Sequence, residues 1–229
     1  MGIELLEFPD PAALAEALAE AVAARLRTAL AARDTAHLAV SGGNTPKRFL
    51  RALAAQPLDW EGVRVTLVDE RWVDEASPRS NAALVRAELL HGAAAQARFV
   101  PLYRPTPAPE DALAALEAAL APLLPLDVAV LGMGTDGHTA SFFPGGDRLA
   151  EALDPIGTAT VLPMRAPGAG EPRVTLTLPV LLAAHHRFLH IEGAAKRTVL
   201  AEAQAADRQI MPVAALLHAD AALPVFWCP

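Results

Sequence analysis

The stretch PLDVAVLGMGTDGH, residues 125–138, decides the fold prediction, because an apolar run passes directly into a glycine-rich loop. Residues 128–131 are apolar without interruption, which is typical of a strand buried on both faces of a parallel sheet. The loop beyond them has the G-x-G-x-x-G spacing, at Gly132, Gly134 and Gly137. That spacing is associated with dinucleotide-binding turns, so the loop is either a cofactor site or a catalytic loop of similar spacing.

Two polar residues in this loop, Asp136 and His138, favour the catalytic interpretation. In a dinucleotide fingerprint the third glycine leads directly into a helix, early in a βαβ unit, whereas this spacing lies past mid-chain. Asp154 falls where a ribose-binding acid would be expected, but it precedes Pro155 rather than ending a strand. An imidazole titrates near neutral pH and a carboxylate can set its tautomer, so the pair predicts a general base. A histidine with a purely structural role is the alternative.

Helical and strand patterns alternate on both sides of this stretch. The helical patterns cover 10–32, 46–56, 80–92, 109–123, 194–206 and 213–219, and the strand patterns cover 36–40, 62–71, 125–134, 173–178, 186–193 and 224–227. Such alternation predicts an α/β protein with a Rossmann-like, mainly parallel sheet and helices on both faces. No repeat of fixed period and no linker interrupts the pattern, so we expect a single domain over residues 1–229.

Three polar loops follow predicted strands directly: SGGNTP at 41–46, DERW at 69–72, and the histidine loop at 132–138. In open α/β sheets the ligand crevice lies at the carboxyl ends of the strands. We therefore expect the side chains of these loops to converge on one cleft.

The first of these loops has the features of an anion site. Gly42 and Gly43 let backbone N–H groups approach a ligand closely, and a helix is predicted to begin near Pro46. Side-chain donors come from Ser41, Asn44 and Thr45. An ordinary tight turn between strand and helix is the alternative.

The second loop places Asp69, Glu70 and Arg71 beyond an apolar strand. An arginine fork there suits an anionic substrate, and a carboxylate there can orient other groups. A local ion pair at a solvated strand end is the alternative.

Composition excludes several classes of function. The net charge of −7 argues against broad nucleic-acid binding, which depends on neutralising phosphates. No run reaches the roughly 18 apolar residues that suggest a membrane span. The first ten residues carry acids where a signal peptide carries bases. We therefore expect a cytoplasmic protein without a nucleic-acid or membrane partner.

Cysteine and histidine usage argues against a metal site. Cys228 is the single cysteine of the sequence, so no internal disulfide can form. His185 and His186 are adjacent on a predicted strand and would face opposite sides, which makes a poor chelate. We expect neither a metal nor a cofactor.

Taken together, five segments resemble the 6-phosphogluconolactonase family in matching order along nearly the whole chain. They are SGGNTP (41–46), DERWV (69–73), GMGTDGHTASFFPG (132–145), RVTLTLPVL (173–181) and EGAAKRTVL (192–200). The histidine loop is the most specific of them. The wider superfamily includes glucosamine-6-phosphate deaminase and sugar-phosphate-binding regulators, and it shares a Rossmann-like sheet.

The resemblance implies hydrolysis of 6-phospho-D-glucono-1,5-lactone in the oxidative pentose phosphate pathway, by a carboxylic ester hydrolase. It implies that His138 is the base, that Asp136 orients it, and that Arg71 stabilises the carbonyl oxygen or binds the substrate. The implied substrate- and phosphate-binding residues are Ser41, Gly42, Gly43, Asn44, Thr45, Asp69, Arg173 and Lys196. The small phosphorylated lactone is the expected partner, and the expected assembly is a monomer.

Three other functions fit parts of this pattern. The deaminase also has a G-x-G-x-D-G-H loop, but its catalytic glutamate position is Phe143 here, and Arg71 stands where it typically has tyrosine. A non-catalytic sugar-phosphate sensor would not need Asp136 and His138, and the first predicted strand follows a single helix rather than a DNA-binding helix-turn-helix. A dehydrogenase would require NAD binding.

Ser141 lacks a G-x-S-x-G elbow, so direct attack by water is expected rather than an acyl-enzyme.

Overall fold

The structure is a computed structural model and describes residues 3–219 and 223–229. The helices are α1 (Pro11–Arg33), α2 (Lys47–Ala54), α3 (Asn81–Glu88), α4 (Leu113–Leu120), α5 (Leu149–Ala152), α6 (Leu178–Leu182), α7 (Ala194–Ala203) and α8 (Ala214–Ala219). The strands are β1 (Glu4–Glu7), β2 (Ala36–Val40), β3 (Val63–Leu67), β4 (Asp69–Arg71), β5 (Arg98–Phe99), β6 (Val128–Gly132), β7 (Val161–Met164), β8 (Arg173–Leu176), β9 (His186–Glu192) and β10 (Pro224–Cys228). Within the described ranges, none of the helices combines the length and apolar character that crossing a membrane requires.

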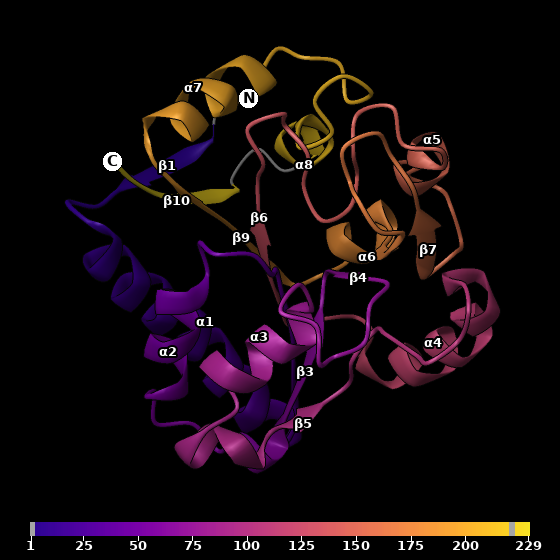
Figure 1. Cartoon of the computed structure of the whole chain (residues 1–229). Coiled ribbons are helices and arrows are strands. Elements are labelled where there is room, and N and C mark those ends of the chain that lie inside the picture. The colour runs from indigo at the N-terminus through magenta and orange to yellow at the C-terminus, as the bar shows by residue number, and fades with distance from the viewer. Residues whose placement is uncertain (1–2, 220–222) are drawn as a thin grey trace.

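The main sheet has seven strands in the order β1-β10-β9-β6-β2-β3-β5, and every neighbouring pair is parallel. The predicted α/β class with a mainly parallel sheet is therefore confirmed. Strand β6 lies in the middle of this order, between β9 and β2, so the glycine loop that follows it leaves the centre of the sheet. Helix α1 packs on β2, β6 and β10, and α7 packs on β9. In Figure 1, α1, α2 and α3 lie on the side of the picture opposite to α4, α5 and α6.

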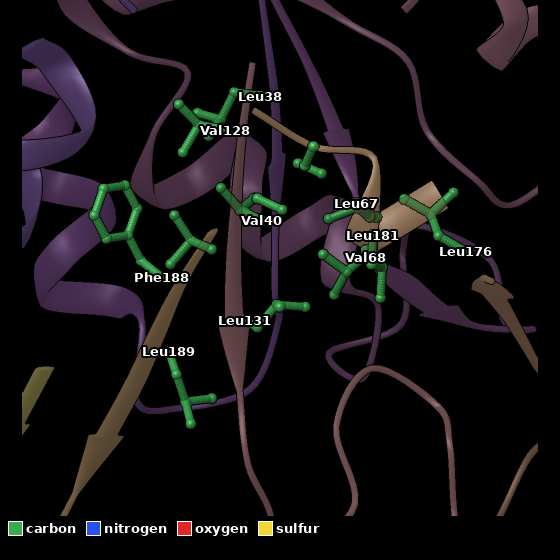
Figure 2. Packing of buried hydrophobic residues seen from close by; sticks show 14 of the residues in the cluster. Leu38, Val40, Leu67, Val68, Val128, Leu131, Leu176, Leu181, Phe188 and Leu189 are labelled. Atoms are coloured by element: carbon green, nitrogen blue, oxygen red, sulfur yellow. The ribbon is translucent and has the colours of Figure 1, made fainter. Parts of the chain in front are cut away.

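The core is built around β6. All four residues Val128–Leu131 are buried, and because alternate residues of a strand face opposite sides, both faces of β6 are covered. Figure 2 shows apolar side chains of the neighbouring strands packed beside it, with Leu38 and Val40 from β2 and Phe188 and Leu189 from β9. This uninterrupted burial explains why the strand reads as a continuous apolar run.

A second sheet, β4-β8-β7, is antiparallel and corrects one prediction. Residues 62–71 were expected to form one strand, but β3 and β4 belong to different sheets. Val68 lies between them, donating its N–H to Val40 at 3.0 Å and accepting the N–H of Leu176 at 2.9 Å. A single residue thus bonds to both sheets, and the chain changes direction there.

Other predicted boundaries also shift. Strand β1 precedes α1, so the expectation that a helix comes before the first strand is wrong; β5 and β7 were not predicted either. The helix expected over 109–123 is α4 flanked by short 3-10 helices that contain Pro109 and Pro122, because proline lacks the N–H that continues an α-helix. The strand expected over 173–178 ends at Leu176, and α6 follows two residues later.

The side chain of Glu70 joins the small sheet to α3. It is 0% exposed, and it accepts the backbone N–H groups of Arg71, Asn81 and Ala82, each at 2.8 Å, together with the hydroxyl of Ser80 at 3.2 Å. Burial raises the pKa of this carboxyl, and the three backbone donors oppose that rise. Glu70 therefore satisfies donors at the first turn of α3 and anchors β4 beside it.

We expect Glu70→Gln to lower the free energy of unfolding by about 2–3 kcal/mol, because one carboxylate oxygen becomes an amide NH₂ that faces existing donors. The measurement is urea denaturation. An unchanged slope of the free energy of unfolding against urea concentration (the m value) would show that the two proteins unfold in comparable transitions. Glu75→Gln, which alters a half-exposed pair with Arg86, is the control and should cost less than about 1 kcal/mol. Equal stability of the two variants would contradict the role given to Glu70.

Candidate active site

A cavity of about 220 Å³ lies at the carboxyl ends of the parallel strands. Its lining includes Ser41, Gly42, Gly43, Asn44, Thr45, Asp69, Arg71, His138, Arg173 and Lys196. The structure thus brings together every predicted site residue except Asp136, which instead contacts the cavity-lining His138. The volume lies below the roughly 300–1,000 Å³ of pockets for drug-sized ligands, so the cavity suits a small molecule.

His138 and Asp136 form a close pair in the loop after β6. Nδ1 of His138 lies 2.6 Å from Oδ1 of Asp136, and the same oxygen accepts the backbone N–H of His138 at 3.2 Å. The hydrogen bond from His138 holds the pKa of the Asp136 carboxyl below its ordinary value. A carboxylate on Nδ1 fixes the tautomer that leaves Nε2 unprotonated, which is the state a general base requires.

The glycines of this loop make room for that pair. A Cβ on Gly134 would lie 2.2 Å from Nδ1 of His138 and 2.5 Å from Oδ1 of Asp136. Gly137 has a φ of +79°, and its N–H donates to the carbonyl of Gly134 at 3.1 Å. The chain enters no helix after Gly137, since α5 begins only at Leu149. The geometry is therefore that of a side-chain loop and not of a dinucleotide turn.

The glycine turn after β2 is tied to the neighbouring segments. The hydroxyl of Ser41 donates to the carbonyl of Val130 at 3.1 Å and accepts the N–H of Gly132 at 3.0 Å, so it bonds to β6 as well as lining the cavity. A Cβ on Gly42 would lie 1.8 Å from Oδ1 of Asn81, and Gly43 has a φ of +92°. Both positions require glycine, and the turn leads toward the amino end of α2.

Lys196 supplies a positive charge at the same end of the cavity. Its Nζ donates to Oγ1 of Thr45 at 3.4 Å, and among the described residues no carboxylate forms an ion pair with it. Burial lowers the pKa of this ammonium group, and the charge of Glu192 opposes the shift. A half-buried ammonium group without a paired anion is suited to an anionic ligand.

Two arginines line the cavity with donors to spare. Arg173 is 7% exposed; its Nη2 donates to the carbonyl of Ala169 at 2.8 Å and its Nη1 lies 3.8 Å from Oδ2 of Asp69. Burial lowers the pKa of Arg173. Arg71 donates to the carbonyl of Arg79. The Nε atoms of both arginines are buried without an acceptor in the described part of the protein, so each guanidinium has hydrogen-bonding capacity left.

Ser141 has a structural role. It is 0% exposed, it does not line the cavity, and its hydroxyl donates to Oδ2 of Asp69 at 2.5 Å. This bond, with the nearby Arg173, holds the Asp69 carboxylate at the cavity wall. The Ser141 hydroxyl is therefore not exposed to a ligand beside His138, as a covalent mechanism through this residue would require.

An aromatic ring lies where the deaminase pattern has its glutamate. The ring of Phe143 is centred 4.6 Å from that of His138, and the guanidinium of Arg173 lies 5.3 Å from its centroid. Within residues 3–219 and 223–229, Asp136 is the carboxylate that bonds to the His138 ring. No second acid is therefore placed to move a proton with this histidine.

Sequence reasoning missed two polar residues of the cavity, Asn81 and His190. Nδ2 of Asn81 donates to the carbonyl of Asp69 at 2.9 Å, and His190 lies near the carboxyl end of β9. The strand-end rule that selected the three loops also applies to β9 and was a usable signal for His190. In the described part of the chain, no group of three or more His, Cys, Asp or Glu side chains is arranged to hold a metal ion.

Comparison with known proteins gives a consistent result. The family model described as glucosamine-6-phosphate isomerases/6-phosphogluconolactonase matches residues 9–227. The chain is 56% identical to the 6-phosphogluconolactonase of Rhizobium meliloti over 225 residues, covering 97% of each sequence. It is 48% identical to that of Pseudomonas aeruginosa, covering 100% of this chain and 96% of the relative.

Solved structures agree with the sequence relatives. The crystal structure of a 6-phosphogluconolactonase from Shewanella baltica has a TM-score of 0.91 at 36% identity, covering 99% of this chain and 98% of that one. A monomeric glucosamine-6-phosphate deaminase has a TM-score of 0.80 at 17% identity and so shares the fold. On the family match over nearly its whole length and on these relatives, the chain belongs to the glucosamine-6-phosphate isomerase/6-phosphogluconolactonase family.

Proposed function

We propose that this protein hydrolyses 6-phospho-D-glucono-1,5-lactone to 6-phospho-D-gluconate in the oxidative pentose phosphate pathway. The observation that carries the proposal is the His138–Asp136 pair in a cavity that also presents Lys196, Arg71 and Arg173. Hydrolysis of a lactone that carries a phosphate group requires a base to activate water, and positive charge to bind the phosphate and stabilise the oxyanion. The relatives at 56% and 48% identity are 6-phosphogluconolactonases, which supports the proposal.

In the proposed reaction water attacks the lactone carbonyl carbon directly. Nε2 of His138 accepts a proton from this water as the new C–O bond forms, and Asp136 stabilises the imidazolium through Nδ1. The bond between the carbonyl carbon and the ring oxygen then breaks, and the ring oxygen takes a proton to become a hydroxyl. The product acid ionises, so each turnover releases one proton to the solvent.

The guanidinium groups are assigned to the negative charges of the substrate and transition state. Arg71 lines the cavity and is the candidate to stabilise the developing oxyanion. The glycine turn, Thr45 and Lys196 receive the phosphate, with Arg173 at the cavity wall. The mechanism needs neither a cofactor nor a covalent intermediate, which fits the buried position of Ser141.

Three further expectations belong to the proposal: a monomer, a single domain and a location in the cytoplasm. Sedimentation analysis of the purified chain tests the first. A single cooperative unfolding transition tests the second.

Replacing His138 with alanine is expected to lower kcat by about 10²–10⁴-fold, because the general base is lost while the anion-binding residues remain. The assay is proton release from freshly made lactone in weak buffer, with the spontaneous opening subtracted. His91→Ala is the control, since His91 is exposed and outside the cavity. If wild type gives no acceleration, the proposed function is wrong, and ammonia release from glucosamine 6-phosphate is the next assay.

Gly134→Ala is expected to lower kcat by about 10²-fold with little loss of stability, because the new methyl group would displace the His138 ring and Asp136. Gly168→Ala offers a comparison, as a Cβ there meets no atom within 4 Å. Because Gly168 has a positive φ, its substitution is expected to lower the free energy of unfolding and to leave kcat unchanged. Full activity of Gly134→Ala would show that catalysis does not depend on the present positions of His138 and Asp136.

Lys196→Met is expected to raise KM by about 10–100-fold with a smaller change in kcat, because a charge-assisted contact with the phosphate is lost from ground state and transition state alike. Initial rates over a range of lactone concentrations separate the two parameters. Arg98→Met removes an exposed cation outside the cavity and should change neither. An unchanged KM in Lys196→Met would remove Lys196 from the phosphate site.

A further inference from the structure

His190 is a buried titratable group in the cavity that the proposed mechanism does not use. It is 3% exposed, yet its side chain lines the cavity together with Ser41, Gly132 and Lys196. Its register partner on β6 is Gly132, which has no side chain to separate the imidazole from the glycine turn. The imidazole therefore lies at the floor of the cavity.

The packing of His190 places it at the end of the cavity that suits an anion. Its ring meets the ring of Phe49 edge-on, with centroids 6.2 Å apart and an interplanar angle of 77°. Phe49 belongs to the first turn of α2, the helix that follows the glycine turn. His190 is thus packed beneath the helix end toward which the turn directs its N–H groups.

One ring nitrogen of His190 is already engaged by a carboxylate. Nε2 lies 3.2 Å from Oε1 of Glu192, two residues along β9. The same Glu192 acts electrostatically on Lys196. Within the described residues, Nδ1 has no hydrogen-bond partner, so a protonated Nδ1 could donate a hydrogen bond to a bound anion.

We propose, on the basis of the function proposed above, that His190 is a further residue of the phosphate site and takes up a proton when the phosphoryl group binds. The opposite charges of Glu192 and Lys196 balance each other before binding. A phosphate dianion adds two negative charges, and an imidazolium between it and Glu192 would hydrogen-bond to both. Phosphate binding and proton uptake are then coupled.

Other charged or titratable groups lie near His190 and compete with it for the proton. They are Glu192 on its own strand, Lys196 on α7, Cys228 on β10 opposite Glu192, Arg48 of α2, whose charge acts on Cys228, and His138 across the cavity. Strand β6 contributes none, because Gly132 is the register partner. Lys196 is the main competitor, since burial lowers its pKa and an anion would raise it again.

The experiment is calorimetric titration of the intact protein with inorganic phosphate, in two buffers of different ionisation enthalpy. About pH 8 is suitable, because most inorganic phosphate is then already a dianion, and the proton released by the remaining monoanion on binding is included in the analysis. The expected result for wild type is an uptake approaching one proton per phosphate. His190→Gln should abolish that uptake and weaken binding by about tenfold.

Three other variants make the test specific. Glu192→Gln should reduce the uptake without removing the imidazole, and it carries the test if His190→Gln does not fold. His138→Gln should leave the uptake unchanged. Uptake that persists in His190→Gln and disappears in Lys196→Met would assign the proton to the lysine and overturn the proposal, as would no uptake in wild type.

The two proposals fail separately. Phosphate binding requires no turnover, so a protein that takes up the proton but opens no lactone would contradict the lactonase function alone. A protein that opens the lactone but binds phosphate without proton uptake would contradict the role of His190 alone.

Discussion

The arrangement of the cavity depends on one buried carboxylate, that of Glu70. Its oxygens accept the N–H groups at the start of α3 and that of Arg71, so they hold β4 against the helix. Through this contact Asn81 reaches both the carbonyl of Asp69 and the Cα of Gly42. The same group therefore positions both the glycine turn after β2 in the main sheet and strand β4 in the small sheet. A neutral or shorter side chain at this position would not make all of these hydrogen bonds.

Many polar groups of the cavity bond to other parts of the protein, and this leaves a few for the ligand. Ser41 bonds the glycine turn to strand β6, and Ser141 donates to Asp69. The cationic side chains that line the cavity are those of Lys196, Arg71 and Arg173, and among the described residues no carboxylate pairs with Lys196. A chain with a net charge of −7 thus presents a cationic cavity, because local geometry and not average composition determines the field that a small anion meets.

The same fold supports more than one reaction, and the side chains around His138 make the difference. The glucosamine-6-phosphate deaminase that shares the fold at a TM-score of 0.80 is 17% identical to this chain. Here Phe143 packs against the imidazole and beside the guanidinium of Arg173. The fold supplies a crevice at the strand ends, while the chemistry depends on which groups the loops carry into it.

The sequence by itself determined the parallel sheet and the loops that line the cavity, because apolar periodicity and glycine turns are local properties. Only the tertiary structure showed that the Asp136 carboxylate contacts the His138 ring. Only the tertiary structure decided that residues 62–71 divide between two sheets at Val68, that β1 joins the edge beside β10, and that Asn81 and His190 enter the cavity. These features arise from hydrogen bonds and contacts between residues far apart in the chain. The strand-end rule pointed toward His190, but the partners of the other groups are set by the packing of the whole molecule and not by a local pattern.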